Sequence, residues 1–192
     1  MAPQEGYHVR RLDDKLGYGQ EDYSTIIAFF VGVILFALVF SEITFGHGDV
    51  LGLLSSFIVA LMGGAGLLGA IRGIRVDSQD FVEAFREDNP EETEIEILYA
   101  GYSKARTRIK DALSVAVMAW LVFGGYAGAI EIAVFEGIIT IKDWTMLGVL
   151  HFLSFVSFIL AIVLYLRKRS IEKALFAIQL KKSDKAEISI KI

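Results

Sequence analysis

Four long apolar stretches constrain the fold of this chain more than any other feature of its sequence. They run roughly over residues 26–43, 50–71, 112–135 and 145–166, and each is nearly free of charge. A length of about 18 to 24 residues allows a helix to cross about 30 Å of hydrocarbon, since a helix rises about 1.5 Å per residue. Hydrophobic residues make up 54% of the chain, which leaves only short polar segments between the stretches. The sequence therefore predicts an all-α membrane protein with four transmembrane helices.

The positions of the basic residues predict the orientation of these helices. Of the 19 lysines and arginines, all except Lys142 lie before the first stretch, between the second and third, or after the fourth. A chain with four spans has these three segments on one side of the membrane, and short segments rich in Lys and Arg remain in the cytoplasm. We therefore expect a multi-pass protein of the cell membrane with both termini in the cytoplasm (N-in, C-in).

The expected organisation has five parts. Because three further spans follow the first apolar stretch, we interpret that stretch as a retained anchor rather than a signal peptide. The parts are a cytoplasmic N-terminal segment (1–23), transmembrane helices 1 and 2 (24–71), a cytoplasmic helical loop (72–111), transmembrane helices 3 and 4 (112–166), and a cytoplasmic C-terminal helix and tail (167–192).

Helices 2 to 4 are expected to extend beyond the membrane into the cytoplasm. Asn89 and Pro90 form a helix start, with a capping side chain, a proline at the first position and an acid close behind. From there apolar residues recur by alternating threes and fours into the third span, which predicts one helix of about 45 residues. Shorter apolar stripes occur over residues 77–88 and after the fourth span. The three stripes either cover one another within the chain or form a docking platform for a partner.

The last ten residues show a different pattern. Ile188, Ile190 and Ile192 alternate with polar neighbours. This alternation predicts a short strand or a loose tail.

Small residues predict which helix faces pack, because in lipid they let two backbones approach closely. One set recurs every four residues on a face of the second span, and the third span repeats the spacing. Either set packs the bundle internally, or one of them faces a second copy or another subunit. The residues are Gly52, Ser56, Ala60 and Gly64 in the second span, and Gly124 and Gly128 in the third.

Ionisable side chains inside a span are costly in lipid and are therefore candidates for function. Counted from the outer ends of their spans, Glu131 lies about 6 Å and His151 about 9 Å inside the membrane, so the two side chains can meet. Glu131 shares a helix face with Gly128, and His151 shares one with Ser154, which predicts that both turn toward the bundle interior. Ser56 lies at a similar level. Glu42 ends the first span just above.

This polar group has three interpretations. A hydrogen bond between Glu131 and His151 would fix the register of two helices, whereas a cation or proton site would use the same groups at the outer face. Alternatively, Glu131 is unpaired and reaches up to the outer surface. No two of the candidate ligands share a helix at a spacing of three or four, so the metal signal is weak. We expect no cofactor and leave open a divalent cation at the outer face.

The sequence lacks the patterns by which most enzymes are identified. It has no cysteine, and hence no thiolate metal site or cysteine nucleophile. It also lacks a zinc-binding HExxH, a nucleophile elbow and a phosphate-binding glycine loop. The cytoplasmic loop mixes acids with its bases, so it offers no uniform basic face for nucleic acid. We therefore expect a protein that is not an enzyme and does not bind nucleic acid.

Two functional hypotheses remain. The first is a non-catalytic polytopic protein that acts as an oligomeric or accessory subunit of a membrane complex through its extended cytoplasmic helices. Its partners would be membrane lipid, copies of itself or other membrane subunits. The second is an oligomeric cation channel or transporter with an outer-facing vestibule of Glu and His side chains.

Overall fold

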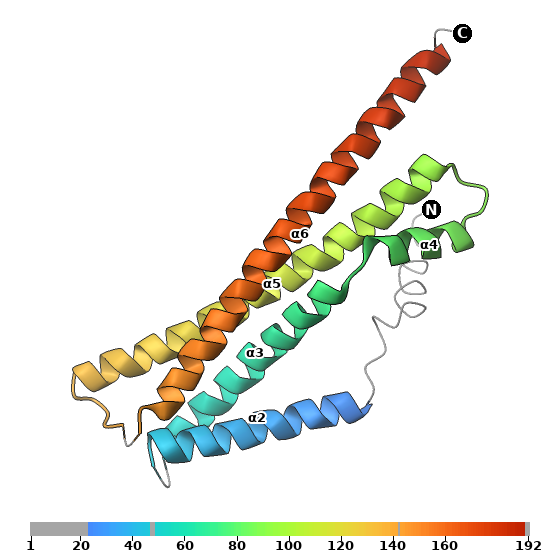
Figure 1. Cartoon of the computed structure of the whole chain (residues 1–192). Helices are drawn as coiled ribbons and strands as arrows, with labels where there is room; N and C mark the ends of the chain where they lie inside the picture. Colours follow the sequence, from blue (N-terminus) through green and yellow to red (C-terminus); the bar gives the residue numbers. More distant parts are fainter. Residues whose placement is uncertain (1–22, 47–48, 142, 191–192) are drawn as a thin grey trace, which may run out of the picture. The chain divides into compact units, whose positions relative to one another are not determined.

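The structure, a computed structural model, describes residues 23–46, 49–141 and 143–190 (Figure 1). Within these residues it contains five α-helices and no strand. All of them except α4 are long and apolar enough to cross a membrane. The prediction of an all-helical protein with four candidate spans is confirmed, and residues 1–22 of the predicted N-terminal segment lie outside the description. The helices are α2 (Tyr23–Thr44), α3 (Val50–Arg75), α4 (Ser78–Asp88), α5 (Glu94–Phe135) and α6 (Thr145–Ile190).

The start of α5 differs from the prediction. Asn89 ends α4 instead of beginning α5, because its backbone N–H and its side-chain amide both donate to the carbonyl oxygen of Phe85, at 3.0 and 3.3 Å. Helix α5 begins at Glu94. Thr93 caps it, and the Thr93 hydroxyl lies 2.8 Å from a carboxylate oxygen of Glu96. The threonine and the acid three residues later form a second capping pattern, which the sequence reading overlooked.

The end of α6 also differs from the prediction. The helix continues without interruption to Ile190, where the alternating isoleucines predicted a strand or a loose tail. Ile192 lies outside the described residues. A lone strand leaves its backbone N–H and C=O groups without partners, whereas a helix satisfies them within one segment. The strand alternative for the described part of the tail is therefore wrong.

The chain divides into two compact units. One, which we call the membrane unit, consists of Asp22–Ile74 and Asp111–Leu164. The described part of the other, which we call the charged unit, consists of residues 75–110 and 165–190. Helices α5 and α6 each contribute residues to both units.

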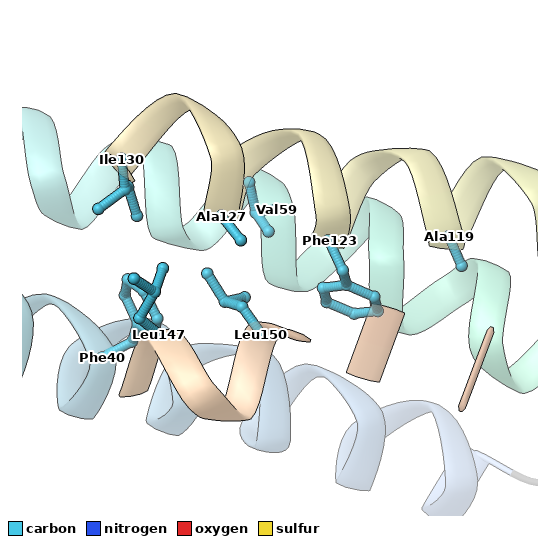
Figure 2. Packing of buried hydrophobic residues seen from close by; sticks show 8 residues of the cluster. All are labelled: Phe40, Val59, Ala119, Phe123, Ala127, Ile130, Leu147 and Leu150. Atoms are coloured by element: carbon cyan, nitrogen blue, oxygen red, sulfur yellow. The ribbon is translucent and has the colours of Figure 1, made fainter. Parts of the chain in front are cut away.

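The core of the membrane unit is one apolar cluster to which α2, α3, α5 and α6 all contribute (Figure 2). Its largest members are Phe40 of α2 and Phe123 of α5, which are 0% and 2% exposed. Because all four helices contribute to this cluster, the pairs α2–α3 and α5–α6 share one core and do not form two separate helical hairpins. The remaining members are Val59, Ala119, Ala127, Ile130, Leu147 and Leu150.

The small residues of α3 let its neighbours approach on two sides. A Cβ atom built on Gly66 would lie 2.6 Å from the carbonyl oxygen of Val115 in α5, and one built on Gly64 would lie 3.2 Å from the ring of Phe29 in α2. Gly64 belongs to the predicted set of small residues that recur every four positions, and the other three members of this set are buried. In the described structure, this set is therefore covered mainly by the chain itself. The buried residues are Gly52, Ser56 and Ala60.

The charged unit buries the apolar stripes that the sequence predicted. Phe81 and Val82 of α4 are buried, and Gly101 of α5 comes so close that an added Cβ would lie 2.8 Å from the backbone of Val82. On α6, Ile171 and Leu175 are buried as well. These residues of the stripes are thus covered within the chain, and the stripes of α4 and α5 meet at Val82 and Gly101.

Ion pairs and hydrogen bonds connect α5 with α6 around these apolar contacts. Glu172 of α6 lies 3.3 Å from Arg106 of α5, and Lys182 lies 3.4 Å from Glu96. Each pair is exposed, so solvent and salt screen its attraction strongly. Their effect is to align two helices that the apolar contacts already hold together.

Candidate functional site

The candidate site centres on Glu131 of α5 and His151 of α6, which the structure brings together. The Nε2 atom of His151 lies 2.9 Å from Oε1 of Glu131. Glu131 precedes the end of α5 at Phe135 by four residues, and His151 follows the start of α6 at Thr145 by six. The pair therefore lies about 6 to 9 Å from the ends of two antiparallel helices. The interpretation of an unpaired Glu131 is wrong.

The pair lies on the surface of the membrane unit. The side chains of His151 and Glu131 are 52% and 49% exposed. The prediction that both turn toward the bundle interior is therefore wrong. The core-facing positions are Ile130 and Leu150, each of which directly precedes one member of the pair. One residue further along a helix means a rotation of about 100°, which carries Glu131 and His151 out of the core.

The two small residues that the sequence predicted on one face of α5, Gly124 and Gly128, have different surroundings. A Cβ built on Gly124 would lie 2.8 Å from the hydroxyl oxygen of Ser154 in α6, so this glycine is covered within the chain. A Cβ built on Gly128 would meet nothing within 4 Å, and the same is true of Gly148 in α6. The face that carries the Glu–His pair is therefore open.

The predicted serines belong to separate contacts. Ser154 is buried, and its hydroxyl donates to the carbonyl oxygen of Trp120 at 3.4 Å. Ser56 is also buried and donates to the carbonyl oxygen of Gly52 at 2.6 Å. Neither serine forms a hydrogen bond with Glu131 or His151 in the part of the chain that the structure describes.

Sequence reasoning missed a second polar contact between helices, which involves Tyr126 of α5. Its hydroxyl lies 2.7 Å from the hydroxyl of Ser55 and 3.4 Å from that of Ser56 in α3. A tyrosine inside a span was the available signal, because a buried phenolic hydroxyl usually has a polar partner. The contact links α3 to α5 close to the loop ends of these helices.

Glu42 does not join the pair. It is exposed near the end of α2, and neither the hydrogen bonds nor the ion pairs of Glu131 and His151 include it. Among the described residues, no three His, Cys, Asp or Glu side chains are placed to hold a metal ion. Glu42, Glu131 and His151 thus do not form such a group within the described part of one chain.

The geometry allows the pair two kinds of chemistry. An imidazole and a carboxylate in contact can share a proton, and together they form a polar contact between two helices. Because both side chains are half exposed, they also offer polar atoms to a group outside the chain.

No protein-family model matches this chain, and neither the curated proteins nor the solved structures contain a match.

Proposed function

We propose that this chain is a non-catalytic, multi-pass protein of the cell membrane that acts as an oligomeric or accessory subunit of a membrane complex. Both termini lie in the cytoplasm, as the distribution of Lys and Arg predicts. The charged unit is then cytoplasmic and carries the contact surface. The observation that carries this proposal is an exposed apolar patch on that unit.

The patch consists of Phe176 and Leu180 of α6 with Tyr99 of α5, and we call it the α6 patch. Phe176 is 63% exposed and Leu180 is 51% exposed. They are four residues apart and hence on one face of the helix. The amide of Gln179 donates to the Tyr99 hydroxyl at 3.4 Å, which places Tyr99 beside them.

The α6 patch is not needed for the packing of the charged unit. Ile171 and Leu175 are the buried apolar side chains of this part of α6. Phe176 directly follows Leu175 and therefore points away from that buried side. Covering a large apolar side chain that water now reaches stabilises a complex by about 1.5 to 3 kcal/mol. The patch thus favours a protein partner in the aqueous compartment.

The lengths of α5 and α6 support the same function. They contain 42 and 46 residues, whereas about 20 suffice to cross a membrane. About half of each helix is therefore available outside the hydrocarbon. Helices α5 and α6 each contribute residues to both units, so a partner bound to the charged unit would bind the same two helices that enter the membrane unit.

Native mass spectrometry of the protein in lipid nanodiscs tests this proposal. We expect a defined oligomer or complex for the natural chain, and at least about tenfold weaker association when Phe176→Ser and Leu180→Ser are combined, since two interface anchors are removed. Glu83→Ser, at an exposed position of α4, is the matched control and should assemble normally. Far-UV circular dichroism checks that all variants retain their helices. A natural chain that is monomeric, or a double variant that assembles as well as the control, would contradict the proposal.

A second candidate function is an oligomeric cation channel or transporter. The observation that favours it is the half exposure of Glu131 and His151 near one end of the membrane unit, where several copies would gather these pairs into a vestibule. The inner half of the unit is apolar, so a pathway would have to form between copies. Glu131→Gln should then abolish cation flux into liposomes while the oligomer persists. If the natural chain shows no flux, this second function is excluded.

A further inference from the structure

The Glu131–His151 pair is exposed where the surroundings are hydrocarbon. Trp144 is 55% exposed just before α6 begins, as expected of an aromatic residue at the membrane–water interface. His151 follows it by seven residues, which corresponds to about 10 Å of helix. At that depth exposed ionisable groups are costly. The bond between the two side chains lowers the cost, but about half of each remains exposed.

Both side chains have unused hydrogen-bonding capacity. The imidazole of His151 has two ring nitrogens and the carboxylate of Glu131 has two oxygens, and their mutual bond occupies one atom of each. Throughout the described residues, neither side chain has another hydrogen bond or ion pair. One ring nitrogen of His151 and one carboxylate oxygen of Glu131 therefore have no partner among the described residues.

The surface around the pair is open to the approach of another backbone. Gly128 is one turn from Glu131, and Gly148 is one turn from His151. A Cβ at either glycine would meet nothing within 4 Å, whereas one at Gly66 of α3 would press on α5. We call Gly128, Glu131, Gly148 and His151 together the Glu–His face.

The acid and the base on the Glu–His face determine which kind of molecule could bind there. A lipid phosphate would suit His151 but would repel Glu131, and a free cation would suit Glu131 but would repel a protonated His151. A complementary surface has to present both an acid and a base at one depth. The chain itself presents such a surface.

We infer that a second copy of this chain binds the Glu–His face around a two-fold axis. All copies insert in the same orientation, so a two-fold axis that relates two copies is parallel to the membrane normal. Rotation about such an axis does not change depth, so each residue can contact only those residues of the second copy that lie at the same depth in the membrane. Glu131 and His151 share one depth, because they are bonded to each other. Each His151 therefore bonds its own Glu131 and the Glu131 of the second copy. This inference deepens the proposed function and rests on it, but it uses a different surface from the α6 patch.

Cysteine crosslinking in native membranes tests the position of the second copy. The chain has no cysteine, so a single introduced thiol reports one contact. Gly128→Cys and Gly148→Cys should give crosslinked dimers with a short bis-maleimide. Gly32→Cys of α2, where an added Cβ also meets nothing within 4 Å, is the matched control and should not. Ile132→Cys, at a position 60% exposed beside Glu131, repeats the test if a glycine variant fails to fold. Equal crosslinking at Gly32, or none at the Glu–His face, overturns the inference.

Mixing two variants tests the role of the pair. Copies with Glu131→Gln keep His151, and copies with His151→Gln keep Glu131, so only the mixed dimer retains a Glu–His bond between copies. Measured by energy transfer in liposomes, the mixed dimer should form about 3- to 20-fold more tightly than either variant with itself, the range expected for one hydrogen bond between membrane helices. Equal affinities would show that the pair acts only within one chain, and would overturn the inference.

Native mass spectrometry separates failure of this inference from failure of the proposed function. An oligomer that persists without crosslinks at the Glu–His face overturns the inference and leaves the proposed function standing. A monomer overturns both. A lipid retained at this face in place of a second copy also overturns the inference.

Discussion

Replacing Gly66 by alanine tests the close approach of α3 and α5 in the membrane unit. The new Cβ would lie 2.6 Å from the carbonyl oxygen of Val115 and 2.9 Å from the Cβ of Ala119. Two carbon atoms in contact rest about 3.5 to 4.0 Å apart, so the helices would have to separate by about 0.6 to 1.1 Å. Neither neighbouring atom can move alone, because one belongs to the backbone and the other is fixed to it.

The expected loss of stability is the difference between two effects. Overpacking of this kind costs about 1 to 3 kcal/mol. Alanine recovers about 0.5 to 1 kcal/mol, because it restricts the unfolded chain more than glycine does. The difference lies between about 0 and 2.5 kcal/mol, and we expect Gly66→Ala to lower the free energy of unfolding by about 1.25 kcal/mol, the middle of that range. The equilibrium constant for unfolding would then rise about eightfold.

Gly32→Ala is the matched control, because an alanine at this position of α2 would meet nothing within 4 Å. It should be as stable as the natural chain or more stable by about 0.5 to 1 kcal/mol. Unfolding by dodecyl sulfate in mixed micelles, followed by the fluorescence of Trp120 and Trp144, measures both variants. If Gly66→Ala proves as stable as Gly32→Ala, the close packing of α3 on α5 is refuted.

Two further predictions concern the charged unit. Gly101→Ala would place a Cβ 2.8 Å from the backbone of Val82, so it should loosen α4 and speed the hydrogen exchange of its amides, and unchanged exchange would contradict the contact. A hydrogen bond from the Thr93 hydroxyl, with a smaller contribution from Lys182, holds the pKa of Glu96 below its ordinary value of 4.5, so Thr93→Val should raise this pKa in an NMR titration of the carboxyl group. Because the pKa of Glu96 is lowered in the folded state, its bond to Thr93 stabilises the start of α5 at pH values above about 4.5, and this stabilisation is lost as the pH falls through the folded pKa. If the pKa of Glu96 stays the same in Thr93→Val, the hydroxyl does not cause the shift.

The start of α4 has a local signal, because an Asp directly before an amphipathic segment is a common helix cap. Asp77 accepts a hydrogen bond from the backbone N–H of Gln79 and caps α4. Asn89 was misleading because two signals lie close together there, an asparagine suited to either end of a helix and the threonine cap of Thr93. The choice between them depends on where α4 ends, and the two hydrogen bonds from Asn89 to the carbonyl oxygen of Phe85 mark that end.

The sequence predicted how far Glu131 and His151 lie from the ends of their helices, but not which side of the bundle they face. Helical rise is constant, so counting from the ends of the spans was enough to place Glu131 and His151 at one level. The rotation of each helix about its axis depends on which neighbours it packs against. Ile130 and Leu150 occupy the core positions and turn the pair outward, and those contacts join residues far apart in the chain.

The sequence by itself determined the number and length of the candidate spans, because apolarity over about 20 residues is a local property that needs no partner. It also determined the distribution of charge from which the orientation is proposed. Only the tertiary structure decided which helix faces are covered, so that Gly66 is enclosed while Gly128 is open. The physical reason is that lipid is as apolar as the core of the bundle. Hydropathy therefore does not distinguish a face that packs from a face that meets lipid, and only the fit between distant side chains does.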